Sequence, residues 1–506
     1  MKYGAIAGGE KSTVQAAFNI MENGGNAFDA AVGAVFTSMV SEYCLTGPGG
    51  GGAFLASPVN AEPILFDFFV DTPHPQPEKE LDFFSIIVDF GPSQQQFYIG
   101  QGSVAIPGNI AGLLKVHQRL GQIPLKAVLE PAVNAARDGI ILNSSQGYLI
   151  KILEPILTYS NGGKVIFSPN GKLLKKDDRF KNPRFADLLE ILVAEGHMYF
   201  YEKDGAELIL NTVGEKGLLT KEGLALYRVA ERVPLKSDFR GKTIYTNPAP
   251  SAGGTLITFI LQLLERSKTG TKSELIDLIR AMQITSAARK EISIDMNNEF
   301  QISQLLEPRT FSHYLRLFDS GSTPSQNEKD PVSRGETTHV SVIDKHGNAA
   351  SVTTTNGEGC GYIIPELGMM LNNMLGEEDL NPMGFHQWAH QRRLPTMISP
   401  TIVMGEKGVE LVLGSGGSNR LRSAISQVIL NLFAKKMDLE AAVHTSRIHL
   451  EGNVLHYEPG TILEPSMDDI RLHPWDENNL FFGGVNAVSP SEAISDPRRG
   501  GTGMIR

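Results

Sequence analysis

Apolar and polar residues alternate most regularly two-thirds of the way along the chain. Two β-like runs, 338–344 and 349–355, flank a turn that contains Asp, Gly and Asn, the residues that hairpin turns favour. Pairing the runs about the centre of this turn places Thr337 opposite Thr355, to within one residue. The pattern therefore predicts a hairpin over 338–355 whose open end brings two threonine hydroxyls together.

The rest of the chain predicts a mixture of helices and strands. Helical periodicity or capping signals mark the segments 10–45, 124–140, 254–268, 272–290 and 419–435. Strand-like runs mark the hairpin-rich patch 52–106, residues 240–247 and the neighbourhoods of 400–404 and 409–414. Between 145 and 235 short helices alternate with polar loops. The polar interval Ser320–Arg334 is expected to be the least structured part.

The composition limits the partners that the protein can have. With 41% hydrophobic and 20% charged residues, the 506-residue chain is typical of a soluble globular protein. The net charge is −10 and no run of Lys and Arg is long enough to follow a phosphate backbone, so we expect no nucleic-acid partner. The apolar stretch Ala30–Val40 is too short for a membrane span, so we expect no membrane partner.

Cysteine and histidine usage predicts neither disulfides nor a metal centre. Cys44 and Cys360 provide no disulfide framework, and Cys44 is expected to be buried. This usage fits a reducing compartment, and the first residues lack the apolar core of a secretory signal, which predicts a cytoplasmic protein. Only His386 and His390 share a helical spacing, and two ligands make a weak metal site. We expect no metal and no other cofactor.

The paired threonines suggest a specific chemistry. A threonine hydroxyl is a poor nucleophile at neutral pH and needs a base. If the backbone is cut just before Thr337, the new α-amino group, with a reference pKa of about 7.7–8.0, can take the hydroxyl proton. The alternative is that a threonine-rich hairpin is simply a hairpin, since threonine favours strands. Cys360 is a weaker nucleophile candidate because no base flanks it.

Six glycine- or threonine-containing segments support this chemistry. They are, in chain order, Glu22–Ala31, Gly47–Phe54, Ser103–Gly108, Pro248–Gly254, Thr337–Val342 and Gly414–Ser418. In content, order and spacing they resemble the motifs of the γ-glutamyltransferase family of N-terminal-nucleophile (Ntn) hydrolases, over nearly the whole chain. The resemblance implies an α+β fold, a four-layer αββα sandwich. It also implies one domain built from a large segment, 1–336, and a small segment, 337–506, that stay associated after cleavage between Glu336 and Thr337.

The resemblance also implies roles for individual residues. Thr337 matches the nucleophile, and Thr355 matches a second threonine that hydrogen-bonds the nucleophile and its amine. Gly416 and Gly417 match the residues whose N–H groups form the oxyanion hole, and donors without a Cβ can approach a developing alkoxide closely. Without the family, an ordinary turn would explain these glycines. His339 is expected to be a satisfied core histidine.

The chain departs from the family pattern where the substrate would bind. The family holds the substrate carboxylate with an arginine, yet no arginine occurs from Met1 to Gln118. The matching substrate-binding positions are altered or displaced as follows. Met374 replaces a polar residue, Glu377 replaces an Asp that binds the α-amino group, Thr396 and Met397 replace two serines, and Asn356 lies one place from the family's asparagine. In the tail, Arg498 and Arg499 are expected to form structural ion pairs.

These departures leave three functional hypotheses. The first is a self-processing N-terminal-threonine amidohydrolase or acyltransferase acting on a small γ-glutamyl-like amide, with water or an amine as acceptor. The second is an acylase for a glutaryl-like or more apolar acyl group, since an apolar wall rejects analogues less strongly than a polar site does. The third is a γ-glutamyltransferase-like protein that binds without turnover. Met374 and Met397 could equally fill gaps in a core, and the number of copies in the assembly, including a homo-oligomer, is left open.

Overall fold

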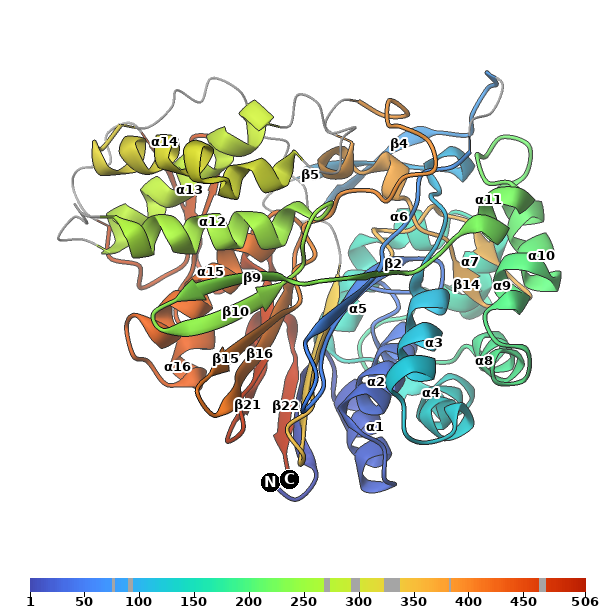
Figure 1. Ribbon diagram of the computed structural model, residues 1–506. Helices are drawn as coiled ribbons and strands as arrows, with labels where there is room; N and C mark the ends of the chain where they lie inside the picture. Colours follow the sequence, from blue (N-terminus) through green and yellow to red (C-terminus); the bar gives the residue numbers. More distant parts are fainter. Residues whose placement is uncertain are drawn as a thin grey trace.

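Two β-sheets are stacked face to face and covered by helices on both outer sides (Figure 1). The computed structural model describes residues 1–74, 78–89, 94–267, 274–292, 301–322, 337–381, 384–463 and 470–506. This arrangement of helix layer, sheet, sheet and helix layer confirms the predicted α+β fold, an αββα sandwich. Within these residues, no helix is both long enough and apolar enough to cross a bilayer.

The seven-stranded sheet contains the predicted hairpin. In spatial order its strands are β22 (Thr502–Ile505), β1 (Gly4–Gly8), β11 (Thr338–Asp344), β12 (Ala349–Thr355), β2 (Gly51–Ser57), β3 (Ile64–Phe68) and β8 (Ala230–Arg232). Neighbouring strands in it run antiparallel. The antiparallel pairing of β1 with β22 explains why the two termini lie side by side in Figure 1.

The six-stranded sheet faces the first one. In spatial order its strands are β21 (Ala493–Ile494), β20 (Gly484–Val488), β16 (Gly408–Gly416), β15 (Thr401–Gly405), β10 (Lys242–Thr246) and β9 (Leu235–Phe239). Both sheets therefore combine strands from either side of position 337. Segments 1–336 and 337–506 interleave in one body, although the cut between them stays a prediction because Glu336 lies outside the described residues.

Helices cover the two outer faces. Those on the side of the hairpin sheet are α1 (Lys11–Glu22), α2 (Ala27–Ser41), α3 (Asn109–Leu120), α4 (Leu125–Asp138), α5 (Ser144–Ile152), α6 (Glu154–Leu157), α7 (Asn161–Phe167), α8 (Pro183–Glu195), α9 (Met198–Glu202), α10 (Asp204–Val213) and α11 (Lys221–Leu226). Those on the other side are α12 (Ala252–Arg266), α13 (Glu274–Ile292), α14 (Pro308–Asp319), α15 (Arg420–Phe433) and α16 (Leu439–His444).

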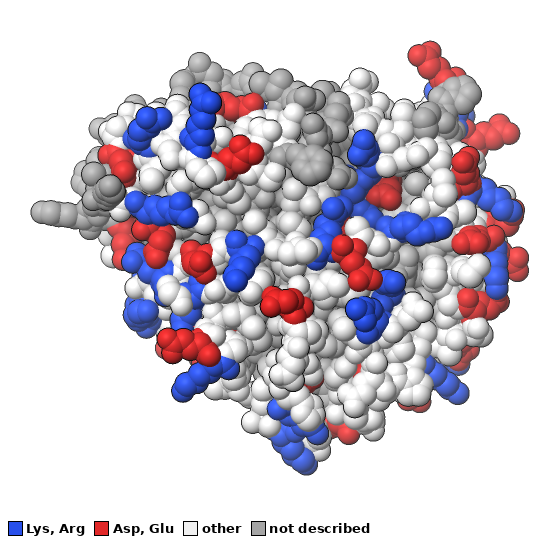
Figure 2. Space-filling view, in the orientation of Figure 1, with Lys and Arg blue, Asp and Glu red and all other residues white. Residues whose placement is uncertain are grey.

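Smaller strand groups complete the fold. They are β4 (Phe84–Asp89) with β5 (Gln94–Ile99), β6 (Ile140–Ile141) with β7 (Arg179–Phe180), β13 (Ile363–Ile364) with β14 (Met369–Met370), and β17 (Ile448–Glu451) with β18 (Val454–Tyr457) and β19 (Arg471–Pro474). On the face shown in Figure 2, Lys and Arg are interspersed with Asp and Glu. His386 and His390 do not share a helix: His386 has φ +60° and its Nε2 lies 3.1 Å from the carbonyl oxygen of Gly102.

Helix α2 lies along the hairpin and fixes both of its ends. At its start, Asn26 and Asp29 form a reciprocal capping box, which satisfies N–H groups that the first turn leaves unpaired. The N–H of Ala27 also donates to Asp344 at the hairpin turn (3.0 Å). All fifteen residues of the helix are buried, so its packing, and not an amphipathic stripe, holds it in place. Its far end brings Glu42 beneath the open end of the hairpin.

Candidate active site

The open end of the hairpin brings the two threonines together as predicted. Strand β11 pairs with β12 through Thr338 and Thr354, and continuing this register by one step sets Thr337 opposite Thr355. Thr337 is 4% exposed and Thr355 is 6% exposed. The Thr355 hydroxyl also accepts a hydrogen bond from the N–H of Gly357 (3.0 Å), which ties it to the loop that follows.

Successive residues of β11 face opposite layers, as strand geometry requires. His339 points toward the second sheet, where a Cβ on Gly414 of β16 would lie 2.3 Å from its Cε1. Its ring nitrogens lie 2.7 Å from Thr353 Oγ1 and 2.9 Å from Ser341 Oγ of the hairpin itself. Burial lowers the pKa of His339 to about 3, so the ring is neutral at working pH. His339 is thus a satisfied core histidine, as predicted. Thr337 immediately precedes β11, and continuing the alternation of the strand by one residue places it on the same face as His339.

The glycines at the end of β16 approach the nucleophile candidate closely. A Cβ on Gly416 would lie 2.2 Å from the carbonyl oxygen of Thr337, so only glycine permits this contact. Gly417 has φ +121°, a conformation that glycine alone adopts without strain. Ser415 fixes the strand end, because its hydroxyl donates to Gly416 O (2.9 Å) and accepts from Gly484 N (3.0 Å). The structure therefore brings Gly416 beside Thr337; the oxyanion-hole role stays a prediction.

An aspartate joins this glycine loop to the loop that carries Glu377. Ser418 Oγ donates to one carboxylate oxygen of Asp379 (2.6 Å), and Asn419 Nδ2 donates to the other (2.7 Å). Both contacts are buried. The sequence analysis did not single out Asp379, which ends the acidic run Glu377–Asp379. The run itself was the available signal, because a buried carboxylate needs partners and the residues after the Gly-Gly pair supply them.

Glu377 lies inside the site. A Cβ on Gly357 would be 2.4 Å from Glu377 Oε1 and 2.1 Å from Asn373 Oδ1, so this carboxyl packs against the loop that binds Thr355. Burial, reinforced by the charge of Asp379, raises the pKa of Glu377 to about 8. Its carboxyl is therefore largely neutral at pH 7, and a cationic group nearby would favour the charged form. Asn356 instead points its Nδ2 at the carbonyl groups of Met370 (3.4 Å) and Leu371 (3.5 Å).

The two methionines belong to apolar clusters. Met374 is 1% exposed and packs in a cluster that contains Phe69 and Leu375. Met397 is 6% exposed and belongs to the cluster beneath α12 and α15. Thr396 is also buried, and its hydroxyl accepts from the N–H of Ile398 (3.2 Å). This burial supports the gap-filling alternative, while a role in the acyl pocket stays a prediction.

An arginine that the sequence analysis missed reaches the segment where the family's arginine is absent. Arg393 is 9% exposed, and its Nε lies 3.5 Å from Asp67 Oδ1 and 3.3 Å from Asp71 Oδ1. Its terminal nitrogens donate to Tyr227 Oη (2.6 Å) and to the carbonyl oxygens of Arg228 and Phe69. The guanidinium thus acts as an internal clamp, because carboxylates and carbonyls of the protein occupy it.

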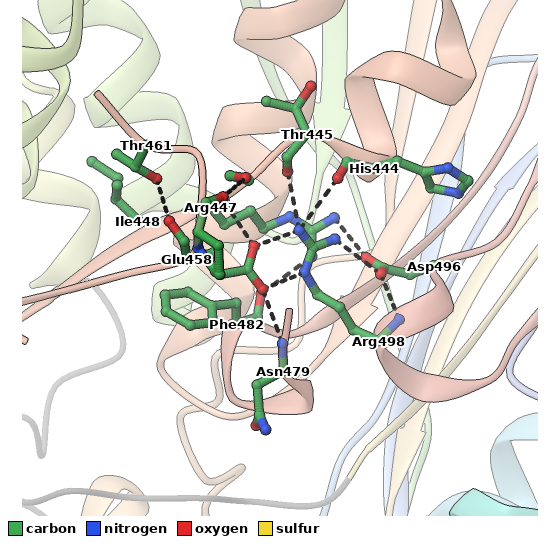
Figure 3. A network of polar contacts seen from close by, with 12 residues as sticks. His444, Thr445, Arg447, Ile448, Glu458, Thr461, Asn479, Phe482, Asp496 and Arg498 are labelled. Atoms are coloured by element: carbon green, nitrogen blue, oxygen red, sulfur yellow. Dashed lines mark hydrogen bonds and ion pairs between the residues drawn. The ribbon is translucent and has the colours of Figure 1, made fainter. Parts of the chain in front are cut away.

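The two tail arginines, Arg498 and Arg499, contact different partners. Arg498 donates to Glu458 Oε2 (2.5 Å) and Asp496 Oδ1 (3.1 Å), and Arg447 lies 2.6 Å from the other oxygen of Asp496 (Figure 3). Burial alone would raise the pKa of Asp496, but Arg447 and Arg498 together lower it. Arg498 is therefore a structural ion-pair partner, as predicted. Arg499 Nη1 donates to the carbonyl oxygen of Thr337 (3.4 Å), and its predicted ion-pair role stays a prediction.

The cysteines do not compete for the nucleophile role. Cys360 is buried, and burial raises the pKa of its thiol to about 12, so it stays protonated and unreactive. Cys44 is half-buried, not buried as expected, because it lies past the end of α2 at the rim of a small cavity. In the part of the chain that the structure describes, no three His, Cys, Asp or Glu residues are grouped to hold a metal ion.

Comparison with known proteins places the chain in a class. The crystal structure of cephalosporin acylase from Bacillus halodurans superposes with a TM-score of 0.81 at 19% identity, covering 99% of this chain and 96% of that one. This likeness shows that the two chains share a fold. A sequence profile described as gamma-glutamyltranspeptidase matches residues 13–505. The chain therefore belongs to the γ-glutamyltranspeptidase family and is a hydrolase or acyltransferase of that type.

The family relatives divide between two named activities. The glutathione hydrolase proenzyme of Escherichia coli (strain K12) is 30% identical, with 88% of this chain and 81% of that protein aligned. The acylase ACY 1 proenzyme of Pseudomonas sp. (strain SE83) is 28% identical, with 93% of this chain and 87% of that protein aligned. Both names describe proenzymes.

Proposed function

We propose that this protein cleaves itself before Thr337 and then acts as an N-terminal-threonine amidohydrolase or acyltransferase on small-molecule amides. One observation carries the proposal: the hairpin register and the contact with Gly416 bring Thr337, Thr355 and the glycine loop to one point. The precursor names of the relatives support the self-cleavage. A cytoplasmic location, and association of the two segments after cleavage, belong to the same proposal.

The chemistry follows from this geometry. The Thr337 hydroxyl gives its proton to its own α-amino group, and its Oγ attacks the carbonyl carbon of the substrate amide. The N–H groups of Gly416 and Gly417 hold the negative charge on the carbonyl oxygen. The C–N bond then breaks, and the departing amine takes the proton from the α-ammonium group. Water or a second amine attacks the resulting ester in the same way and releases the acyl group.

A specific set of contacts favours an acyl group other than free γ-glutamate. The guanidinium of Arg393 is occupied by Asp67, Asp71 and backbone carbonyls, so it is not available to hold a substrate carboxylate. Glu377 remains in the site and would pair with an amine on the acyl group. The second candidate function is an acylase for glutaryl-like or more apolar acyl groups. The occupied guanidinium favours the more apolar groups, because a glutaryl-like group would still present a carboxylate.

A panel of γ-glutamyl, glutaryl and aliphatic p-nitroanilides tests both candidates. The processed protein should release p-nitroaniline from at least one of them, and Thr337→Ala should release none. Thr337→Ser is the matched control, because it keeps a hydroxyl at the same position and should retain measurable turnover. A fully processed protein that hydrolyses no member of the panel, yet binds one of them, would favour the binding-protein hypothesis instead.

A further inference from the structure

Glu42 lies directly behind the nucleophile strand. Its side chain is buried, and its two carboxylate oxygens accept hydrogen bonds from Thr338 Oγ1 (2.5 Å) and Thr13 Oγ1 (3.0 Å). The Thr13 hydroxyl is itself 2.8 Å from Ser41 Oγ. A Cβ on Gly9 would lie 2.1 Å from Glu42 Oε2, so backbone packs against the carboxylate. The carboxylate is therefore fixed in position by hydrogen bonds from hydroxyl groups on α1 and β11.

Glu42 cannot act on Thr337 directly. Side chains at successive positions of β11 point to opposite faces, and His339, two residues after Thr337, faces the second sheet. Thr338 points the other way, toward the helix layer, where Glu42 receives its hydroxyl. Any effect of Glu42 on the nucleophile must therefore pass through Thr338.

Arg499 binds the peptide group between Thr337 and Thr338. Arg499 Nη1 donates to the carbonyl oxygen of Thr337 (3.4 Å). Glu42 and Arg499 both line one small cavity, whose other walls include Tyr43, Gln146 and Phe167. The peptide group that joins Thr337 to Thr338 is thus held from two directions. The Glu42 carboxylate binds the Thr338 side chain, and the Arg499 guanidinium binds the Thr337 carbonyl oxygen.

We propose that Glu42 is a positioning residue for the nucleophile: its carboxylate anchors Thr338, and with Arg499 it fixes the start of β11 so that the Thr337 hydroxyl faces Thr355 and the glycine loop. The inference rests on the proposed function, since it concerns the same nucleophile. It adds a residue from the first helical hairpin to a site that the sequence motifs build from other segments.

The ionisation of Glu42 gives this role a measurable signature. Burial, and to a smaller extent Glu10, raise the pKa of Glu42, while the hydroxyls of Thr338 and Thr13 and the charge of Arg499 lower it; the resulting pKa is about 7. Glu10 precedes α1 and Arg499 ends the 3₁₀ turn Pro497–Arg499; Tyr43 and Cys44 are the other titratable groups at this cavity. Both hydroxyls donate, so the anchored form is the carboxylate, which is lost as the pH falls through about 7.

The test compares Glu42→Gln with the wild type after processing, using the p-nitroanilide that the wild type cleaves fastest. A nucleophile displaced by about 1 Å loses about 10²-fold in rate, so we expect kcat to fall by about 10- to 100-fold with KM changed less than about threefold. In the wild type, two ionisations, those of Glu42 and of the Thr337 α-amine, should shape the acid limb of log kcat against pH. In Glu42→Gln only the ionisation of the α-amine should remain. Glu10→Gln is the matched control: it removes a charge from the same cavity without touching Thr338, so the plateau kcat should hold and the limb should move to lower pH.

A double-mutant cycle shows whether the effect passes through Thr338. Thr338→Val removes the hydroxyl at nearly constant volume, and Thr338→Ser restores it. If Glu42 acts through this hydroxyl, the Glu42→Gln, Thr338→Val double variant should be no more than about threefold slower than the slower single variant. Effects that multiply, or an active wild type whose kcat and pH profile Glu42→Gln leaves unchanged, would overturn this inference alone. A processed wild type without turnover would end the inference and the proposed function together.

Discussion

Replacing Gly416 with alanine perturbs the site by a single carbon whose position is known. The new Cβ would lie 2.2 Å from the carbonyl oxygen of Thr337, whereas carbon–oxygen contacts normally lie at about 3.3–3.6 Å. The end of β16 must therefore move from β11 by about 1 Å, a displacement that costs about 10²-fold in rate. If the shift also removes one oxyanion donor, the loss reaches about 10²–10³-fold, or roughly 3–4 kcal/mol in the barrier.

The assay measures kcat on the processed fraction of the Gly416→Ala protein, with processing followed by intact mass. Gly408→Ala is the matched control, because Gly408 begins the same strand with φ +109° and a Cβ added there would have no heavy atom within 4 Å. That variant should lose about 1–3 kcal/mol of stability from backbone strain but keep kcat within about threefold. Equal kcat values for the two variants would refute the close approach of β16 to the nucleophile.

Three further predictions concern the surroundings of the site. Arg498→Ala leaves Glu458 and Asp496 short of a buried cation and should lower the free energy of unfolding by about 3–5 kcal/mol in urea denaturation; a loss below about 1 kcal/mol would contradict the network. The pKa of Glu42 rises from 4.5 to about 7 on folding, so its stabilising contribution is present below pH 4.5 and lost as the pH rises through 7. The stability of the wild type relative to Glu42→Gln should therefore fall by about 3 kcal/mol between pH 4.5 and pH 8, and a constant difference would be evidence against the buried carboxylate. Cys360→Ser should retain kcat within about threefold, and iodoacetamide should leave Cys360 of the native protein unmodified at pH 8, because burial raises its thiol pKa to about 12.

Local pattern was enough to predict the hairpin, whereas the place of the glycine loop beside Thr337 was predicted from the family resemblance. Alternation and turn residues set the register, which the structure reproduces at Thr338 and Thr354. A glycine cluster marks places where a backbone must come close, and Gly416 meets Thr337 in this way. The hairpin signal depends on neighbours along the chain, so it can be recognised without tertiary structure. The contact of Gly416 with Thr337 joins separate segments, and local pattern alone would indicate an ordinary turn there.

The charged groups around the site were not predictable in the same way. In the sequence, Glu42 is simply a polar residue at the end of an apolar helix. Its contact with Thr338 joins positions nearly 300 residues apart. The contacts of Arg393 are also long-range, because it reaches Asp67 and Asp71 from a segment late in the chain. Arg499 likewise reaches the carbonyl oxygen of Thr337, far from it in the chain, while its neighbour Arg498 binds Glu458. Tertiary approach alone decides such contacts.

The central claim is that backbone scission frees Thr337 to act as its own base. Intact-mass and N-terminal fragment analysis of the purified, mature protein tests it directly. The account predicts two chains of about 37 and about 18 kDa, in proportion to residues 1–336 and 337–506 of the 55.0 kDa total, with the smaller chain beginning at Thr337. A protein that hydrolyses amides while remaining one intact chain would contradict it.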